Sequence, residues 1–156
     1  INNVPVLDVR RKITHKVIGN RSFSTDPHLV SKLGKICIYK FHKNHIATVL
    51  KHIPGHGLSK LDTHKKLPIV NKDLKYLIKN DFQCFKNTNS LFAMTAHILY
   101  KKIDNKNCAT HSSIIIKKII RKKPETVPQF LRTAKDLTDA DWQRLTEIVR
   151  TMKDKK

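Results

Sequence analysis

The sequence predicts an α/β fold built around a parallel sheet. Three short apolar runs, each bounded by polar residues, Gly or Pro, are typical of buried strands; they cover residues 4–9, 46–50 and 91–95. Segments of helical length follow these runs and cover residues 26–42, 71–86 and 112–121. Because strands that alternate with helices form right-handed βαβ units, about three parallel strands with flanking helices are expected.

The first two predicted helices are supported by their apolar positions. Asp26 is expected to cap the first helix, and Pro27 to occupy its first turn, where the N–H that Pro lacks has no helical partner. Residues at helical spacing define its expected apolar face: Leu29, Val30, Leu33, Ile36 and Cys37. The second helix is expected to bury a similar set: Leu74, Leu77, Ile78, Phe82 and Phe85.

The chain changes character after Lys123, where Glu first appears and Pro124 and Pro128 interrupt a basic run. We therefore expect one domain over residues 1–123 and a helical C-terminal extension of unknown origin over residues 124–156. Thr138 is expected to cap a helix in this extension. The apolar stripe of that helix would contain Trp142, Leu145, Ile148, Val149 and Met152.

The charge of the chain is strongly positive, with 32 Lys and Arg against 12 Asp and Glu and a formal net charge of +20. Residues 1–123 carry 25 of the 32 basic residues, so the first domain holds nearly all of the excess. One interpretation is a surface that binds nucleic acid. The other is a Lys-rich solvated surface produced by a biased composition. The scarcity of Arg favours the second, since the planar Arg guanidinium binds phosphate with two hydrogen bonds.

The cysteines and the hydropathy pattern indicate the cellular compartment in which the protein is expected. Cys37, Cys84 and Cys108 share no short spacing, which predicts neither a disulfide framework nor a Cys-based zinc site. The sequence contains no apolar run of roughly 18 residues and no signal-peptide pattern, so no membrane partner is expected. We predict a cytoplasmic protein. The chain begins with Ile rather than Met, which suggests a piece of a longer product.

The densest chemical motif is the heptapeptide of residues 51–57, which follows the second apolar run. Side chains just beyond the carboxyl end of a parallel strand line the functional crevice, so Lys51 and His52 are expected to line a pocket. Pro54 and the two glycines of the heptapeptide indicate a loop that presents polar groups. His52 and His56 have the spacing of a helical metal-binding pair, but Pro54 breaks such a helix, and no metal is expected.

A second motif, Asp62-Thr63-His64, follows five residues later. A carboxylate two residues from an imidazole can fix its tautomer and raise its basicity. The pair therefore has the composition of an acid/base unit.

Together the two motifs resemble glycoside hydrolase family 3, and within it the bacterial β-N-acetylglucosaminidases, or β-N-acetylhexosaminidases, of cell-wall recycling. Three further stretches agree with that family: residues 4–9, a strand that ends near Asp8; residues 18–23, an arginine loop; and residues 94–97, a later strand end, where Thr95 replaces the more usual Pro. The resemblance covers residues 3–121. It implies a central part of a (β/α)8 TIM barrel, followed here by the helical tail.

The resemblance also implies roles for individual residues. Arg21, Lys51 and His52 match positions that bind the hydroxyls and acetamido region of N-acetylglucosamine, and His97 matches a residue that lines the same pocket. His64, oriented by Asp62, matches the acid/base residue. The family needs no cofactor, and none is expected here.

A retaining glycosidase also needs a carboxylate nucleophile, which the family carries in a Ser-Asp-Asp motif on the next strand. This motif is absent from the sequence. The chain is therefore expected to bind a saccharide from peptidoglycan fragments and to be inactive alone. The missing strands would lie in a second chain or copy, in another part of the gene product, or nowhere. The alternative hypothesis is a basic remnant recruited as an RNA- or ribonucleoprotein-binding structural protein.

Overall fold

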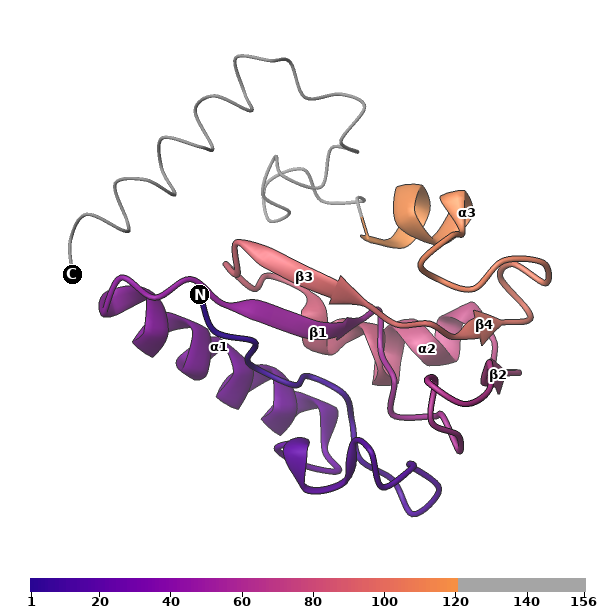
Figure 1. Ribbon diagram of the computed structural model, residues 1–156, viewed down its shortest axis with the longest axis horizontal. Helices are drawn as coiled ribbons and strands as arrows, with labels where there is room; N and C mark the ends of the chain where they lie inside the picture. Colours follow the sequence, from indigo (N-terminus) through magenta and orange to yellow (C-terminus); the bar gives the residue numbers. More distant parts are fainter. Residues whose placement is uncertain (121–156) are drawn as a thin grey trace.

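The computed structural model describes residues 1–120, which adopt an α/β fold with parallel strands (Figure 1). The predicted extension over residues 124–156, with its capped helix, lies outside the described residues. In chain order the elements are η1 (Gly19–Arg21), α1 (Pro27–Lys43), β1 (Val49–Ile53), β2 (Ile69–Val70), α2 (Leu74–Asn80), η2 (Phe82–Phe85), β3 (Phe92–Thr95), β4 (Leu99–Tyr100), α3 (Ser113–Ile115) and η3 (Ile116–Ile120). None of the helices in this part of the chain is long and apolar enough to cross a membrane.

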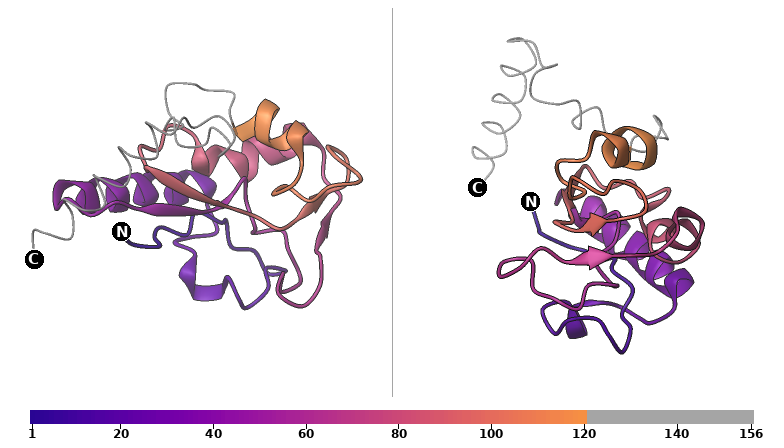
Figure 2. Two further views of the ribbon diagram at one scale, coloured as in Figure 1. Left: turned by 45° about the horizontal axis from the view of Figure 1, so that its top comes forward. Right: turned by 90° about the vertical axis from the view of Figure 1, so that its right-hand side faces the viewer.

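Two pairs of parallel strands organise the fold. β1 pairs with β3, and the ladder runs from Val49 opposite Phe92 to Ile53 opposite Thr95. β2 pairs with β4 over two residues each. Helices α1 and α2 lie on the same side of the strands (Figure 2). The predicted parallel α/β arrangement is therefore confirmed, whereas the short strands β2 and β4 were not predicted.

The first predicted strand, residues 4–9, is only partly regular. It lies parallel to β1, as expected, but the pairing consists of isolated bridges between Asn2 and Thr48 and between Val6 and Lys51. Pro5 lacks an N–H and cannot donate to a ladder, although its carbonyl accepts from the Lys51 N–H at 3.0 Å. The prediction of a continuous strand was wrong for this reason.

The second strand begins and ends three residues later than predicted. The apolar run 46–50 suggested an end at Leu50, but β1 runs from Val49 to Ile53 and contains Lys51 and His52. The register shifts between Lys51 and Ile53, so the strand bulges at His52. A bulge redirects side chains near the end of a strand. Lys51 and His52 therefore lie in the final residues of the strand rather than beyond it.

Helix α1 follows its prediction at the start and departs from it on the buried face. The side chain of Asp26 accepts a hydrogen bond from the His28 N–H at 2.9 Å, and Pro27 is the first helical residue. The fully buried positions are Val30, Gly34 and Ile38. Leu29 and Ile36, expected on the apolar face, are 42% and 47% exposed. The helix axis instead approaches the first strand at Gly34, where an added Cβ would lie 2.2 Å from Leu7 Cδ2.

The second predicted helix is divided. α2 ends at Asn80, and the 3₁₀ helix η2 begins at Phe82. Between them stands Asp81, which is only 2% exposed and whose carboxylate pairs with Arg11. An ion pair with a residue far away in the sequence does not change the helical spacing of apolar residues. The prediction of a single helix over residues 71–86 was therefore wrong. The third helical segment, by contrast, begins as predicted, because the side chain of Ser112 caps it by accepting from the Ile115 N–H.

The buried side chains form two clusters that support the carboxyl ends of the strands. One cluster contains the first strand, α1, β1 and η2 through Leu7, Val9, Val30, Ile38, Leu50, Cys84 and Phe85. The other joins α2, η2, β4 and α3 and contains Leu77, Phe82, Ile98, Tyr100 and Ile115. Ile53, the last residue of β1, packs against both clusters. The end of β1 is therefore fixed on both sides.

Candidate active site

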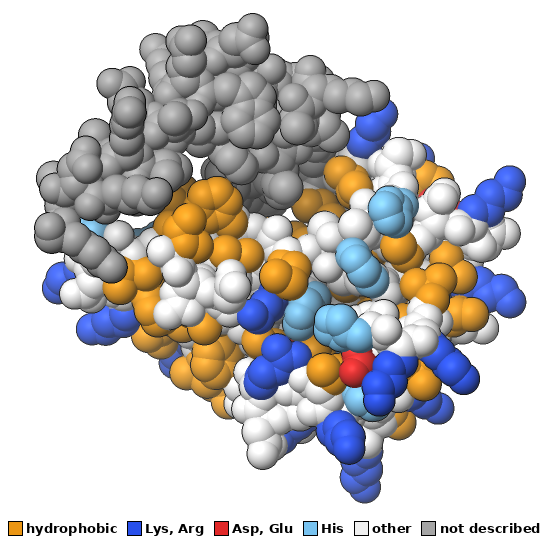
Figure 3. Space-filling view, viewed as in Figure 1, with side chains coloured by type: hydrophobic (Ala, Val, Ile, Leu, Met, Phe, Trp, Pro, Cys, Tyr) orange, Lys and Arg blue, Asp and Glu red, His pale blue; other side chains and the backbone are white. Residues whose placement is uncertain are grey.

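Histidine side chains gather in a row on one face of the molecule, over the carboxyl ends of β1 and β3, with Lys and Arg side chains beside them (Figure 3). In parallel α/β sheets, this edge is where ligands bind. The edge therefore combines the geometry of a binding site with donors that suit polar ligands.

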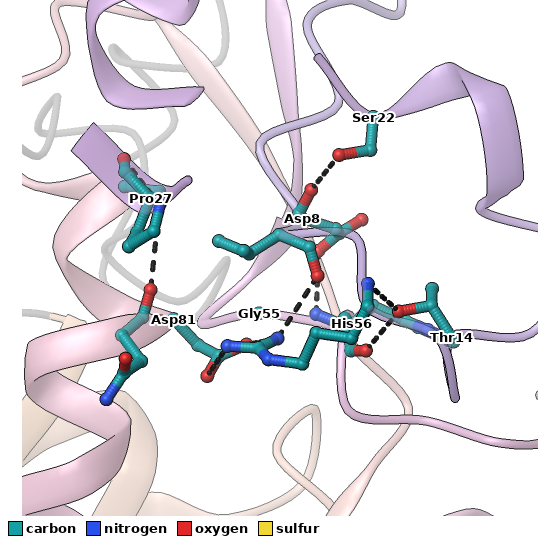
Figure 4. Close-up of polar contacts among 12 residues, drawn as sticks. Asp8, Thr14, Ser22, Pro27, Gly55, His56 and Asp81 are labelled. Atoms are coloured by element: carbon teal, nitrogen blue, oxygen red, sulfur yellow. Dashed lines mark hydrogen bonds and ion pairs between the residues drawn. The ribbon is translucent and has the colours of Figure 1, made fainter. Parts of the chain in front are cut away.

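Asp8 is fully buried and forms the hydrogen bonds that hold His52 and His56 of this edge in place. Its Oδ1 accepts from the backbone N–H groups of His56, at 2.6 Å, and His52, at 3.3 Å. Its Oδ2 lies 2.7 Å from Nδ1 of His52. Ser22 donates to the Asp8 carbonyl at 2.6 Å, and Figure 4 shows Ser22 and His56 approaching Asp8 from two sides. The carboxylate thus fixes the ring of His52 and the course of the loop that follows.

His56 belongs to this loop and is only 3% exposed. Burial lowers the pKa of His56, with Asp8 opposing the shift and His52 adding to it. The rings of His52 and His56 lie 5.3 Å apart. His56 Nδ1 is buried without a hydrogen-bond partner among the described residues. A neutral His56 therefore packs behind His52 as part of its support.

Lys51 and Arg21 supply the positive charge of the edge. Burial lowers the pKa of the Lys51 ammonium, and the nearby Arg21 lowers it further, while Asp8 opposes both. Arg21 lies in η1, where its Nε donates to the Val17 carbonyl at 2.8 Å. The structure thus places Arg21 and Lys51 near the carboxylate that holds His52.

An ion pair between half-buried Arg11 and buried Asp81 supports the loop. Arg11 binds Asp81 with two hydrogen bonds, of 2.8 and 2.9 Å, and also donates to the Val9 carbonyl at 3.1 Å. Gly57 lies against this group, because an added Cβ would stand 2.0 Å from the Val9 carbonyl oxygen. Burial raises the pKa of Asp81, and Arg11 opposes that shift. The loop of residues 51–57 therefore rests on a closely packed polar base.

Thr14 ties the loop to the segment that carries Arg11. Its hydroxyl donates to the Gly57 carbonyl at 2.6 Å and accepts from the Arg11 N–H at 2.7 Å (Figure 4). On the other side, the Tyr100 hydroxyl donates to the Gly55 carbonyl. The loop is thus held at both of its glycines.

His97 stands two residues beyond the end of β3, at the same sheet edge, and is exposed. Its Nδ1 lies 2.5 Å from the hydroxyl of Thr110. Because β3 pairs directly with β1, His97 follows the strand next to the one that contains His52.

Asp62 and His64 form a unit of their own on an exposed loop. Asp62 Oδ1 lies 2.9 Å from His64 Nδ1 and also accepts from the His64 N–H at 3.0 Å. These hydrogen bonds lower the pKa of Asp62. The His64 side chain is 86% exposed, and its hydrogen bonds within residues 1–120 all go to Asp62. The structure therefore pairs the two residues as expected and does not bring them into contact with Lys51, His52 or His97.

Some residues that build the site were not singled out from the sequence. Asp8 was noted as a strand-end residue, but its contact with His52 was not predicted. The Arg11–Asp81 pair joins residues 70 positions apart, so no local pattern could reveal it. Within residues 1–120 no three His, Cys, Asp or Glu side chains are grouped so as to hold a metal ion.

The fold and the site together define an α/β protein with a cationic, imidazole-rich surface at the carboxyl edge of parallel strands. Comparison with known families is specific: residues 1–125 match the glycosyl hydrolase family 3 N-terminal domain, and the chain belongs to this family. The predicted resemblance is thereby confirmed.

β-Hexosaminidase A of Pseudoalteromonas piscicida is 37% identical over 109 residues, which are 67% of this chain and 18% of that protein. The β-hexosaminidase of Hydrogenovibrio crunogenus is 34% identical over 111 residues, which are 69% of this chain and 31% of that protein.

Solved structures agree with these relatives. NagZ from Neisseria gonorrhoeae, in complex with N-trifluoroacetyl-D-glucosamine, superposes with a TM-score of 0.72 at 32% identity, covering 77% of this chain and 36% of that one. A family 3 β-N-acetylglucosaminidase from Paenibacillus sp. superposes with a TM-score of 0.75 at 31% identity, covering 80% of this chain and 24% of that one. The chain thus spans about a third or less of the length of the relatives described.

Proposed function

We propose that this chain carries the sugar-binding edge and the acid/base loop of a retaining β-N-acetylhexosaminidase that acts on β-linked N-acetylglucosamine in peptidoglycan fragments. The observation that carries the proposal is the buried Asp8 carboxylate, which fixes His52 beside Lys51 and Arg21 at the carboxyl edge. The gonococcal NagZ, whose structure this chain resembles, was solved with a derivative of glucosamine bound.

The groups at this edge suit a neutral, hydroxyl-rich ligand. Arg21 and Lys51 are donors only, and charge-assisted hydrogen bonds to sugar hydroxyls and to the acetamido carbonyl are stronger than those between neutral groups. His52, fixed by Asp8, offers its Nε2. His97, two residues beyond the neighbouring strand, offers a second imidazole. We assign these four residues to binding of the N-acetylglucosamine unit.

Asp62 and His64 are assigned to proton transfer. With Nδ1 held by Asp62, the Nε2 of His64 can give a proton to the leaving oxygen and then take one from water. The exposed position of His64 requires its loop to close over a bound sugar before the proton is transferred, a gating step common among enzymes. Removing the partner carboxylate or the imidazole should therefore leave the binding of sugar to this chain largely intact.

The mechanism also requires a carboxylate beneath the anomeric carbon. The 156 residues contain no Ser-Asp-Asp motif, and Asp8 is already engaged by His52 and His56. We propose that this chain alone binds N-acetylglucosamine without hydrolysing its glycosides at a measurable rate.

Calorimetric titration with N-acetylglucosamine tests the binding assignment. The wild-type chain is expected to bind, and His52→Ala to bind about 10-fold more weakly, since a hydrogen bond to a polar group contributes up to about 1.5 kcal/mol. His45→Asn is the matched control, because exposed His45 precedes β1 at the opposite end of the strand and Asn tolerates its positive φ of 56°. Equal affinities for His52→Ala and the wild type would refute the assignment.

Release of nitrophenol from p-nitrophenyl N-acetyl-β-glucosaminide tests the second part. We expect none above the uncatalysed rate. Turnover that His64→Ala abolishes would mean that these residues supply a nucleophile after all.

The alternative of an RNA-binding remnant is not favoured by the comparisons, in which the relatives described are hexosaminidases and glucosaminidases. The cytoplasmic location and the completion of the barrel by a second chain or copy stay predictions. Fractionation of the source cells and measurement of the molecular mass in solution would test them.

A further inference from the structure

The hydroxyl of Thr110 lies at the centre of a small polar group beside His97. It is 2.5 Å from His97 Nδ1, 2.9 Å from the Thr95 hydroxyl and 3.3 Å from the Ala96 carbonyl oxygen. Thr110 lies on the connection after β4, while the other three groups belong to the last residue of β3 and the two residues that follow it. One hydroxyl therefore joins two parts of the chain at the edge where the binding residues gather.

The number of protons available determines the direction of these hydrogen bonds. A threonine hydroxyl has one proton to donate and two lone pairs with which to accept. Ala96 is 1% exposed. Among residues 1–120, its carbonyl oxygen accepts a hydrogen bond from the Thr110 hydroxyl. Because buried carbonyls are nearly always paired, the Thr110 proton goes to Ala96. Thr95 and His97 must then both donate to Thr110.

We propose that Thr110 is a positioning residue that holds neutral His97 in the tautomer with the proton on Nδ1. The opposite arrangement, in which Thr110 donates to Nδ1, would leave the buried Ala96 carbonyl without a donor. The proposed arrangement leaves Nε2 of His97 with a free lone pair at the exposed edge. His97 thus presents an acceptor, and a ligand hydroxyl would bind it as a donor.

Only the last step, the contact with a sugar hydroxyl, rests on the proposed function. The tautomer is a property of the free chain. Measuring the tautomer therefore tests the positioning role of Thr110 independently of sugar binding.

Two-bond proton–nitrogen correlation NMR of the ¹⁵N-labelled chain distinguishes the tautomers of a neutral imidazole. The spectrum would be recorded near pH 8.5, about two units above the ordinary histidine pKa, and the His97 signals assigned from their loss in His97→Gln. We expect His97 to carry its proton on Nδ1. A wild-type spectrum dominated by the Nε2-protonated form would overturn the proposal.

Two variants separate positioning from general packing. Thr110→Val keeps the side-chain shape and removes the acceptor, so His97 is expected to shift towards the Nε2-protonated form. Thr110→Ser restores the hydroxyl and is expected to restore the wild-type tautomer. An unchanged tautomer in a folded Thr110→Val would refute the role of Thr110. Should that variant not fold, the wild-type and Thr110→Ser spectra still decide, since both must show the Nδ1-protonated form.

Titration with N-acetylglucosamine then tests the consequence. We expect a several-fold lower affinity for Thr110→Val and wild-type affinity for Thr110→Ser. If the tautomer behaves as proposed and the affinities do not differ, the sugar contact of His97 is wrong while the positioning by Thr110 stands. If the wild-type chain does not bind the sugar at all, the proposed function fails and the tautomer result is unaffected.

Discussion

Arg11→Met is expected to lower the free energy of unfolding by about 3–5 kcal/mol, the usual cost of removing one partner from a buried ion pair. Asp81 is 2% exposed, and in this variant its carboxylate would lose both guanidinium hydrogen bonds. The Val9 carbonyl would lose a donor as well. Burial already raises the pKa of Asp81 against the effect of Arg11, so the carboxyl would take up a proton more readily without its partner. Urea unfolding monitored by circular dichroism measures the change.

The neighbouring arginine provides the control. Arg10 is exposed and donates one hydrogen bond of 3.1 Å to Asn20 at the surface, so Arg10→Met is expected to change stability by less than about 1 kcal/mol. Similar losses for the two variants would show that the Arg11–Asp81 pair does not support the loop as described.

Asp8→Asn is expected to weaken the binding of N-acetylglucosamine by about 10- to 100-fold. The substitution keeps the volume of the side chain but removes a carboxylate that engages His52 and the His56 N–H. A hydrogen bond to a charged group contributes about 1.5–3 kcal/mol. The loss of one such bond would displace the imidazole ring of His52, which we assign to sugar binding. Calorimetric titration of the folded variant gives the affinity directly.

A surface carboxylate tests whether this effect is specific. Asp73 pairs with Lys102 at 2.7 Å, but both side chains are largely exposed, and Asp73→Asn is expected to leave sugar binding unchanged. If Asp8→Asn binds the sugar as well as Asp73→Asn does, the buried carboxylate does not organise the site.

Local chemistry in the sequence was sufficient for the parts of the fold that depend on neighbouring residues. The Asp26 cap, Pro27 at the helix start and the third strand were predicted because each depends on a few adjacent positions. The end of β1 was misplaced, since Lys51 and His52 are polar and the pattern suggested a loop. They remain in the strand because its ladder with β3 continues to Ile53.

In the candidate site, too, local features could be predicted from the sequence and long-range contacts could not. Its motif residues could be found because each lies within a short, distinctive string of sequence. The contacts that position them could not be predicted, since Asp8 reaches His52 across 44 residues and Arg11 reaches Asp81 across 70. Thr110 is a further example, because nothing in its own neighbourhood connects it with His97.

The central claim is that Arg21, Lys51, His52 and His97 form one saccharide-binding site at the carboxyl edge of β1 and β3. Backbone amide NMR of the ¹⁵N-labelled chain during titration with N-acetylglucosamine tests this claim directly. We expect shifts at residues 21, 51–57 and 97 that saturate together with a single dissociation constant. Shifts confined to residues 40–46 at the opposite end of the strands, or none at all, would contradict it.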